Sequence, residues 1–312
     1  MKTVLTQSVT EAAEFIKRGG IVAFPTETVY GLGADVFNED AIQKIFDAKM
    51  RPSDNPLIAH VGVQDEISEL AAAIPPAAEK LIASFFPGPL TVVLPKLERV
   101  PLLATAGLET IGIRMPKPRL ARDFLSACGL PVVAPSANLS GRPSPTTWQA
   151  VQEDLDGRID CILQGDATEI GLESTVVDCT STTPLLLRTG AISLERLREV
   201  IPEIRSAASN VDDAPRSPGL RHRHYSPRAS IVILFPGQLC SDNDGAFIGL
   251  HTPPDAVKIE KVCRSVEEYA ASLFEFFREC DRLNVKTICC ERVEEKGIGA
   301  ALMDRLRRAS ES

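Results

Sequence analysis

The stretch from Phe24 to His60, FPTETVYGLGADVFNEDAIQKIFDAKMRPSDNPLIAH, decides the fold of this chain. The apolar run that ends at Phe24 predicts a strand, and the hydroxyl- and glycine-rich segment after it predicts a turn. Asn38, followed by two acids, predicts the start of a helix. That helix must end at or before Pro52, because proline lacks an N–H and clashes with the preceding turn. A second apolar run follows, and it ends at His60. The succession of strand, polar turn, helix, cationic loop and strand predicts a small-molecule site at the edge of a sheet.

Length and charge limit what the protein does. The chain has 312 residues, which exceeds the usual size of one domain, so we expect one large and one small domain. A net charge of −8 argues against a protein that mainly coats nucleic acid. The chain has no signal-peptide pattern and no run of about 18 apolar residues. We therefore expect a cytoplasmic protein with no membrane partner.

The cysteines give no sign of a metal or redox site. The chain has eight of them, and none forms a C-x-x-C pair. This absence gives little support to a zinc site. We expect the eight thiols to be reduced and buried, as is usual in a cytosolic protein.

Strand and helix patterns alternate along the first two thirds of the chain, which predicts the α/β class with a mixed, twisted sheet. The expected helices cover residues 9–18, 66–73, 76–85, 120–128, 148–155 and 194–200, in addition to the helix that starts after Asn38 and ends at or before Pro52. The expected strands cover residues 21–24, 92–94, 110–115, 131–134, 161–163, 174–178 and 184–188, in addition to the apolar run that ends at His60.

The character of the sequence changes between about residues 204 and 228. A small, polar segment leads into the basic and aromatic cluster SPGLRHRHYSP. We interpret residues 1–205 as one domain, 206–228 as a linker and 229–312 as a smaller α/β domain of the nucleotide-fold type. In the last of these, apolar strands are expected at 231–235, 247–250 and 287–290. Helices are expected from Ser265 onward and at 300–308.

Short polar side chains and cations collect near the predicted strand ends. The first half contains no phosphate-binding P-loop, no nucleophile elbow and no H-E-x-x-H motif. It does contain hydroxyls and amides (Thr26, Thr28, Asn55, Ser136, Asn138, Ser140, Ser144, Ser174 and Thr175) together with the cations Lys49, Arg51, Arg114 and Arg188. Ligands of open α/β sheets bind outside strand ends, and such donors suit phosphate and carboxylate. The residues alone therefore predict a site for a nucleotide and a small acid.

The residues alone also leave structural alternatives open. Arg114 fits a surface ion pair, and His60 fits a satisfied histidine at a strand end. The Ser136-x-Asn138 pattern fits a plain Asx turn.

Several motifs together resemble one known family. The segments FPTETVYGLGAD, AKMRPSDNPLIAHV, FFPGPLT, TIGIRMP, APSANLSGRPSPT and GLESTVVD resemble the YrdC-like family of threonylcarbamoyl-adenylate synthases. The linker cluster and the tail KGIGAALMDRLRRAS are similar to the two-domain form of that family. The resemblance runs from near residue 10 to the C-terminus. It implies a YrdC-like twisted mixed sheet with helices, followed by a smaller Rossmann-like α/β domain.

The resemblance also implies an activity. Members of the family make threonylcarbamoyl-AMP and diphosphate from L-threonine, bicarbonate and ATP, with Mg²⁺ as the cofactor. The product is used for t⁶A modification of tRNA, which implies tRNA or the downstream t⁶A transferase as a transient partner. A carbamate oxygen attacks the α-phosphorus, so no protein nucleophile is needed. Catalysis then depends on positioning and charge neutralisation.

The resemblance also implies which residues of this sequence contact the substrates. The implied ATP-binding residues are Lys49, Arg51, Asn55, Thr110, Ser136, Ser144, Arg188 and Tyr225. The implied threonine-binding residues are Thr28, His60, Arg114, the backbone of Ala134, and Ser174.

The same resemblance implies roles for some of these residues. Lys49 and Arg51 would neutralise the triphosphate, and Ser136 and Asn138 would contact phosphates or the metal. These four are the implied catalytic residues. No metal ligand set is implied by protein side chains alone.

Arg114 would pair with the substrate carboxylate as a two-pronged donor. Tyr225 would make the linker a lid over ATP.

Two other functions compete with synthesis. A YrdC-type domain can bind double-stranded RNA or tRNA, although the net charge of −8 and the scarcity of stacking aromatics count against that role. A hydrogenase-maturation carbamoyltransferase would carry zinc fingers, and the chain has no C-x-x-C pair. ATP consumption that requires threonine and bicarbonate together distinguishes synthesis from RNA binding.

Overall fold

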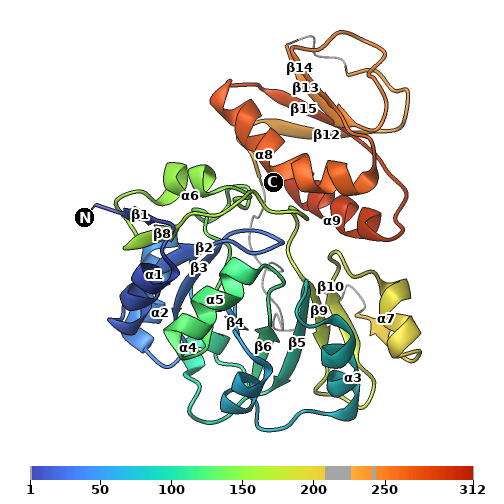
Figure 1. The fold of residues 1–312 in the computed structure, drawn as a ribbon. Helices are drawn as coiled ribbons and strands as arrows, with labels where there is room; N and C mark the ends of the chain where they lie inside the picture. The colour runs from blue at the N-terminus through green and yellow to red at the C-terminus, as the bar shows by residue number, and fades with distance from the viewer. Residues whose placement is uncertain (1, 208–225, 241–243, 312) are drawn as a thin grey trace.

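The computed structural model describes residues 2–207, 226–240 and 244–311. Within these ranges, eleven strands form one mixed sheet and four strands form a separate parallel sheet, each with its own helices (Figure 1). The predicted α/β class with a mixed sheet is confirmed. Tyr225 and most of the predicted linker lie outside the described residues, and the domain boundaries at 205 and 228 stay predictions.

The large sheet mixes parallel and antiparallel neighbours. In sheet order its strands are β1 (Val4–Thr6), β8 (Cys161–Leu163), β2 (Val22–Phe24), β3 (Gly31–Asp35), β7 (Val132–Ala134), β4 (Ile58–His60), β6 (Thr110–Arg114), β5 (Leu90–Pro95), β9 (Thr175–Asp178), β10 (Leu185–Arg188) and β11 (Arg205–Ser206). Strand β4 is parallel to β6 but antiparallel to β7. This arrangement determines where strand ends meet, and with it the position of the site.

Helices pack on the sheet through two apolar clusters. The helices of this domain are α1 (Val9–Lys17), α2 (Glu39–Lys49), the 3₁₀ helix η1 (Gln64–Glu69), α3 (Pro76–Phe85), α4 (Leu102–Thr105), α5 (Arg119–Cys128), α6 (Trp148–Leu155) and α7 (Leu194–Val200). Side chains alternate along each strand. In β7, Val132 and Ala134 therefore pack with α1 and α5, while Val133 joins the larger cluster that includes residues of α2, α3, α6 and α7.

Helix ends follow local sequence signals. The Asn38 side chain accepts from the Ala41 N–H, and α2 ends at Lys49 with Met50 in the left-handed conformation. The predicted helix at 66–73 is wrong, because that region forms the 3₁₀ helix η1 instead. Three edge strands, β1, β11 and β14, were not predicted, since none of them has a strong apolar alternation.

The glycine-rich turn predicted after Pro25 is only partly correct, because Gly31 begins strand β3. Glycine is uncommon inside strands, which explains the error. The physical reason for glycine at position 33 is its close packing against Val132 and the ring of Phe24. A Cβ added at Gly33 would lie 2.6 Å from Val132 Cγ1 and 3.1 Å from Phe24 Cε1. Both neighbours therefore occupy the space that a side chain at this position would need.

We therefore expect Gly33→Ala to destabilise the protein. The added methyl overpacks the contact with Val132, which typically costs about 1–3 kcal/mol. Urea denaturation measures the free energy of unfolding. The double variant Gly33→Ala/Val132→Ala should lose less than the sum of its two single variants, and additive losses would contradict the steric explanation.

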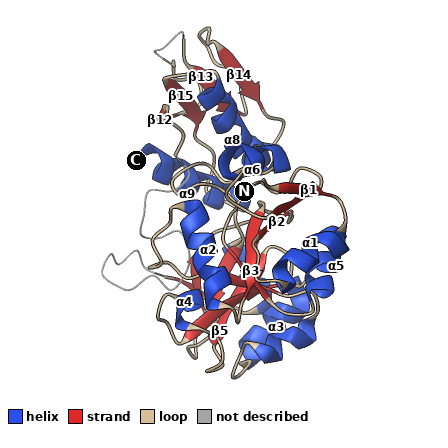
Figure 2. Cartoon of the chain, turned by 90° about the vertical axis from the view of Figure 1, so that its left-hand side faces the viewer, coloured by secondary structure: helices blue, strands red, loops and turns tan. Residues whose placement is uncertain are grey.

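The C-terminal domain is a small parallel α/β unit. Its elements are β12 (Ser230–Leu234), β13 (Ala246–Gly249), β14 (Ile259–Val262), α8 (Val266–Arg282), β15 (Thr287–Glu291) and α9 (Ile298–Ser310), and its sheet order is β12-β15-β13-β14. Ser265 caps α8 by accepting from the Glu268 N–H, and the predicted apolar face of α8 is buried. Helices α8 and α9 lie between the small sheet and the large domain in both views (Figures 1 and 2).

The expectation of eight reduced thiols is wrong for one pair. Cys240 and Cys289 form a disulfide with a Cα–Cα distance of 6.0 Å. The two residues are 49 positions apart, so only the tertiary structure brings them together. Neighbouring strand residues point to opposite faces, which is why Cys289 is in this bridge while Cys290 is a free, buried thiol in the main core of the domain. The other five cysteines are free and buried, as expected.

Within the ranges given above, no helix combines the length and the apolar character needed to cross a bilayer.

Candidate active site

One pocket of about 670 Å³, including its open mouth, lies on a face of the large sheet. The strand register explains how the pocket is built. Ile58 of β4 pairs with Ala134 of β7 on one side and with Gly112 of β6 on the other, and His60 pairs with Arg114. Residues that pair across strands share a face, so these side chains point the same way.

The position of the pocket corrects the sequence prediction in one respect. His60, Arg114, Ala134 and Arg188 line the pocket and are the last residues of their strands, as expected. However, β7 is antiparallel to β4, so the end of β7 meets the start of β4 at Ile58. The pocket therefore spans the sheet face instead of one edge.

All five residues predicted to contact threonine line this pocket. They are Thr28, His60, Arg114, Ala134 and Ser174. The Thr28 hydroxyl lies 2.9 Å from that of Thr26, and the Ser174 hydroxyl lies 2.8 Å from that of Thr91. The hydroxyls of Thr28 and Ser174, which lie in the part of the pocket predicted to bind threonine, therefore each have a fixed partner. They give this part of the pocket a defined polar wall.

Arg114 is only 4% exposed and is held from two sides. Its Nη1 donates to Thr28 Oγ1 at 2.8 Å, and its Nη2 lies 2.8 Å from Glu27 Oε1. A buried arginine needs such a counter-charge. The alternative of a surface ion pair is therefore wrong for Arg114, since the pair is buried and faces the pocket.

His60 is a neutral, fixed histidine. Its Nδ1 lies 3.1 Å from the Ile58 carbonyl oxygen, and its ring meets the ring of Phe24 edge-on. Burial, and then the charge of Arg114, lower the pKa of His60 to about 3. The histidine can therefore contact a ligand without carrying a charge at neutral pH.

This low pKa predicts a pH-dependent stability. The unfolded histidine takes up a proton below about pH 6.5, whereas the folded one does so only near pH 3, so stability falls as the pH is lowered between these values. From pH 7 to pH 4.5, His60 should account for about 2.5 kcal/mol of lost unfolding free energy.

Denaturant titrations of the wild type and His60→Gln at both pH values check this expectation. The variant should lose less stability between the two pH values than the wild type. Equal losses would show that His60 titrates normally in the folded protein.

The second half of the pocket is rich in cations and short donors. Arg51, Ser136, Asn138, Ser144 and Arg188 line it. The Ser136 hydroxyl donates to Asn138 Oδ1 at 2.6 Å, and the Asn138 amide donates to the carbonyls of Leu139 and Arg142 at 2.8 Å each. Arg188 donates from Nε to the Ser174 carbonyl and from Nη2 to the Ser174 hydroxyl, both at 3.0 Å. Ser174 thus joins the two halves of the pocket.

Lys49 supports the pocket from behind its wall. It is 2% exposed, and its Nζ donates to the carbonyls of Ser136 and Asn138 at 2.5 and 2.6 Å. Burial, and then the neighbouring Arg51, lower the pKa of Lys49 well below its ordinary value. In this geometry Lys49 holds the Ser136-x-Asn138 turn, and its predicted contact with phosphates stays a prediction.

Two predicted ATP contacts lie beside the pocket. Thr110 lines a second, mostly apolar hollow of about 270 Å³, and Ile58 is common to both hollows. Asn55 is 1% exposed, and its two side-chain amide atoms have no hydrogen-bond partner among the described residues. Asn55 lines neither hollow, but its backbone carbonyl accepts from Nη2 of the pocket residue Arg51 at 3.0 Å, so its predicted contact with ATP stays a prediction.

The sequence reading missed three charged residues. Arg142 and Glu173 line the pocket, and Glu27 pairs with Arg114. Burial opposes ionisation of Glu173, yet Arg305 and Arg188 hold the pKa of its carboxyl below the ordinary value. All three lie inside the quoted motifs, but nothing in their spacing separates them from surface charges.

Among the described residues, the pocket wall carries Arg51, Arg114, Arg142 and Arg188 together with the acid Glu173. Arg114 and Arg142 also pair with the buried acids Glu27 and Asp154, but their guanidinium groups still line the pocket, where such donors suit an anionic ligand.

The comparisons with known proteins cover nearly the whole chain. A family model described as "Telomere recombination" matches residues 14–190. A model described as "Threonylcarbamoyl-AMP synthase, C-terminal domain" matches residues 192–311.

Curated relatives and a solved structure agree with both models. The threonylcarbamoyl-AMP synthase of Pyrococcus abyssi is 44% identical over 315 residues, covering 96% of this chain and 93% of the relative. That of Bacillus subtilis is 40% identical over 320 residues, covering 97% and 92%. The crystal structure of P. abyssi Sua5 complexed with L-threonine has a TM-score of 0.91 at 42% identity, covering 99% of this chain and 97% of that one. This chain therefore belongs to the threonylcarbamoyl-AMP synthase family, in its two-domain form.

Proposed function

We propose that this chain is an L-threonylcarbamoyladenylate synthase, a nucleotidyltransferase that converts L-threonine, bicarbonate and ATP into threonylcarbamoyl-AMP and diphosphate. The observation that carries this proposal is that Arg114, Thr28 and His60 line the same pocket as Arg51, Ser136 and Arg188. One half suits an amino-acid carboxylate and the other suits phosphates. The threonine-bound P. abyssi structure, at 42% identity, supports the same assignment.

On the threonine side, Arg114 would receive the substrate carboxylate. Glu27 and Thr28 already hold the guanidinium in place, so little side-chain entropy is lost on binding. The neutral ring of His60 and the backbone of Ala134 would limit the space for the threonine side chain. Ser174, which is fixed by Thr91 and Arg188, would donate or accept a hydrogen bond beside it.

The chemistry needs two steps, in each of which one bond forms and one bond breaks. The threonine amine attacks bicarbonate, and water leaves, giving the carbamate. A carbamate oxygen then attacks the α-phosphorus of ATP, and the bond to the β-phosphate oxygen breaks to release diphosphate. Arg51 and Arg188 would neutralise the charge that builds up on the phosphates, and the main contribution of the protein is to hold the two reactants in line.

The nucleotide base would lie toward the apolar hollow at Thr110. This hollow adjoins the pocket at Ile58, and an apolar surface suits a purine ring. Asn55 would then find a partner for its buried amide. Tyr225 is proposed to close the site from the linker, on the basis of the family resemblance alone.

Magnesium would enter with the phosphates of ATP. Among the described residues, no group of three or more His, Cys, Asp or Glu side chains is placed to hold a metal ion. Ser136 Oγ and Asn138 Oδ1 are hard oxygen donors at the phosphate side, and Mg²⁺ usually takes one or two protein oxygens together with phosphates and water. These two residues fit the ion, which would supply charge neutralisation at the phosphates.

Mass detection of the product tests the proposal. The purified full chain is mixed with ATP, Mg²⁺, L-threonine and bicarbonate, and the threonylcarbamoyl adenylate and diphosphate are quantified. Omission of threonine or of bicarbonate should abolish both products. ATP consumption that is indifferent to threonine and bicarbonate, or no adenylate in the complete mixture, would overturn the assignment.

The product is proposed to serve t⁶A formation in tRNA, in the cytoplasm, with the downstream transferase as its recipient. An adenylate of this kind is an activated acyl donor, so its use requires a second enzyme that transfers the threonylcarbamoyl group. Adding that transferase and tRNA to the reaction should give modified tRNA only when all three small substrates are present.

A further inference from the structure

Two buried arginines of the C-terminal domain reach the residues that form the phosphate side of the pocket. Arg278 lies on α8 and Arg305 lies on α9, and they are 1% and 0% exposed. Arginine is almost never fully buried unless it is paired. Asp304 on α9 pairs with Arg305 Nη1 at 2.5 Å, but Arg278 and the other nitrogens of Arg305 bond to residues of the large domain, so these arginines connect the two domains.

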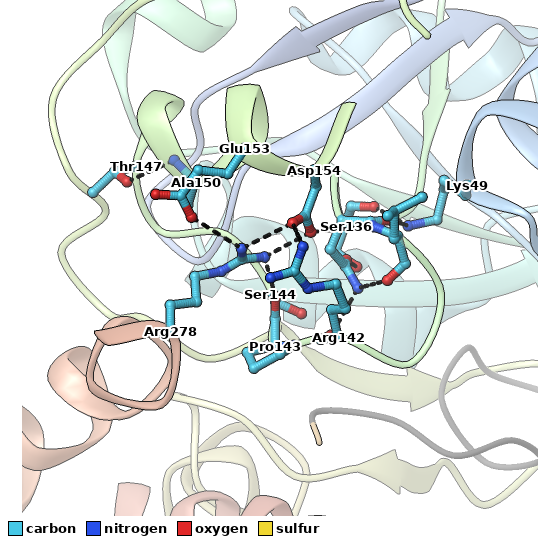
Figure 3. Close-up of polar contacts among 12 residues, drawn as sticks. Lys49, Ser136, Arg142, Pro143, Ser144, Thr147, Ala150, Glu153, Asp154 and Arg278 are labelled. Carbon is cyan, nitrogen blue, oxygen red and sulfur yellow. Dashed lines mark hydrogen bonds and ion pairs between the residues drawn. The ribbon is translucent and has the colours of Figure 1, made fainter. Parts of the chain in front are cut away.

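The guanidinium of Arg278 forms a two-pronged ion pair with one carboxylate on α6. Its Nη1 donates to Asp154 Oδ1 at 3.1 Å, and its Nη2 donates to Asp154 Oδ2 at 2.9 Å (Figure 3). The same Nη2 donates to the carbonyl of Pro143 at 2.5 Å. Two parallel hydrogen bonds of this kind fix orientation as well as distance.

Asp154 in turn holds the segment that carries the pocket residues Asn138, Arg142 and Ser144. Its Oδ2 accepts from the Leu139 N–H at 3.2 Å, and its Oδ1 accepts from Arg142 Nη1 at 2.5 Å. The carboxylate therefore ties the start of the 138–144 loop to its later part. Arg278 fixes both the carboxylate and the Pro143 carbonyl, so the loop is held at three places.

Arg305 acts on the same loop through a second carboxylate. Its Nε donates to Glu173 Oε2 at 2.8 Å, and Glu173 Oε1 accepts from the Ser144 hydroxyl at 2.6 Å. Arg305 Nη2 also donates to the carbonyl of Thr189, which follows Arg188. The two arginines thus both reach Ser144, one through its neighbour Pro143 and the other through Glu173.

We infer that the C-terminal domain is a positioning part of the active site, in which Arg278 and Arg305 hold the 138–144 loop and Ser144 in the geometry that binds the phosphates of ATP. This inference rests on the proposed function, because it assigns the loop to the nucleotide half of the pocket. Arg278 holds the loop through Asp154 and Pro143, whereas Arg114, the proposed partner of the threonine carboxylate, is held by Glu27 and Thr28. For Arg278 the expected effects are therefore specific to the nucleotide.

Steady-state kinetics of the full chain tests the role of Arg278. Arg278→Met keeps a long apolar side chain but removes the paired donors. We expect the KM for ATP to rise at least 10-fold and the KM for threonine to stay within about 2-fold. Arg278→Lys keeps the charge but lacks the two-armed geometry, so its effect on ATP should be intermediate.

The matched control lies one turn further along α8. Arg282 also pairs with α6, through Glu153 at 3.0 Å, but 44% of its side chain is exposed. Among the described residues, Glu153 pairs with Arg278 and Arg282 of α8 and not with the 138–144 loop. Arg282→Met should leave both KM values within about 2-fold of the wild type. A rise in both KM values for Arg278→Met, or the same change in the control, would show a general loss of stability and overturn the positioning role.

Hydrogen exchange gives a readout that does not require turnover. The amides of Leu139, Ser140 and Arg142 are bonded within this region, to Asp154, Lys49 and Leu139 respectively. In Arg278→Met, a peptide covering residues 139–144 should exchange at least 10-fold faster than in the wild type, and Arg282→Met should leave it unchanged. Unchanged exchange in Arg278→Met overturns the inference even if the synthase is active. An inactive wild type with faster exchange in the variant would instead overturn the proposed function alone.

A double-mutant cycle tests Arg305. If Arg305 acts on ATP through Glu173 and Ser144, the effects of Arg305→Met and Ser144→Ala on the KM for ATP should not add. The double variant should resemble the more impaired single variant. Additive effects would show that Arg305 acts elsewhere and would remove it from the proposal.

Discussion

Arg114→Ala is expected to raise the KM for threonine about 100-fold while changing the KM for ATP no more than about 3-fold. The proposed partner of Arg114 is the threonine carboxylate, and losing charge-assisted hydrogen bonds to one ligand group costs about 2–4 kcal/mol, where 1.4 kcal/mol is a factor of ten. Steady-state kinetics with each substrate varied in turn measures the split. Equal rises for both substrates would reject the carboxylate role.

A second variant keeps this result interpretable. Arg114→Ala leaves Glu27, which is 1% exposed, as a buried charge without its partner, and this alone is expected to destabilise the protein by about 3–5 kcal/mol. In Arg114→Met/Glu27→Gln both charges are removed and the volume is kept. We expect this double variant to recover much of the stability while keeping the raised KM for threonine. Recovery of threonine affinity together with stability would show that Arg114 acts on folding and not on the ligand.

Lys49→Met is expected to lower kcat/KM for ATP at least 100-fold and to reduce the free energy of unfolding. The substitution removes the donor to the carbonyls of Ser136 and Asn138, and each buried carbonyl left without a donor costs about 1–3 kcal/mol. The turn that presents Ser136 and Asn138 to the pocket then loses its support. Kinetics below the unfolding temperature and denaturant titration measure the two effects.

Lys44 provides the control on the same helix. Its Nζ donates to the single carbonyl of Gly19 at 2.7 Å, in an exposed position. Lys44→Met should therefore change activity and stability little. Wild-type kcat/KM for ATP in Lys49→Met would contradict the supporting role of Lys49, and a similar loss in Lys44→Met would show that α2 responds to any lost lysine.

Local signals were enough to place most of the elements. Asn38 and Ser265 mark helix starts because their side chains bond to N–H groups only three residues away, within the reach of the sequence itself. The sequence did not predict strand β3, because its glycines are required by contacts with Phe24 on β2 and Val132 on β7, which are neighbours only in the folded sheet. The disulfide between Cys240 and Cys289 was missed for the same reason, since the partner lies 49 residues away.

The site, like the fold, was predicted where local sequence signals sufficed and was not predicted where contacts between distant residues decide. The sequence by itself determined the α/β class, the family and a set of polar residues suited to phosphate and carboxylate, because these depend on composition, local pattern and motif. Only the tertiary structure decided that the pocket lies on the sheet face, that Lys49 stands behind its wall, and that Arg278 and Arg305 reach it from the other domain. Strand register and domain packing set those relations. They join residues more than 80 positions apart, for which no spacing in the chain gives a signal.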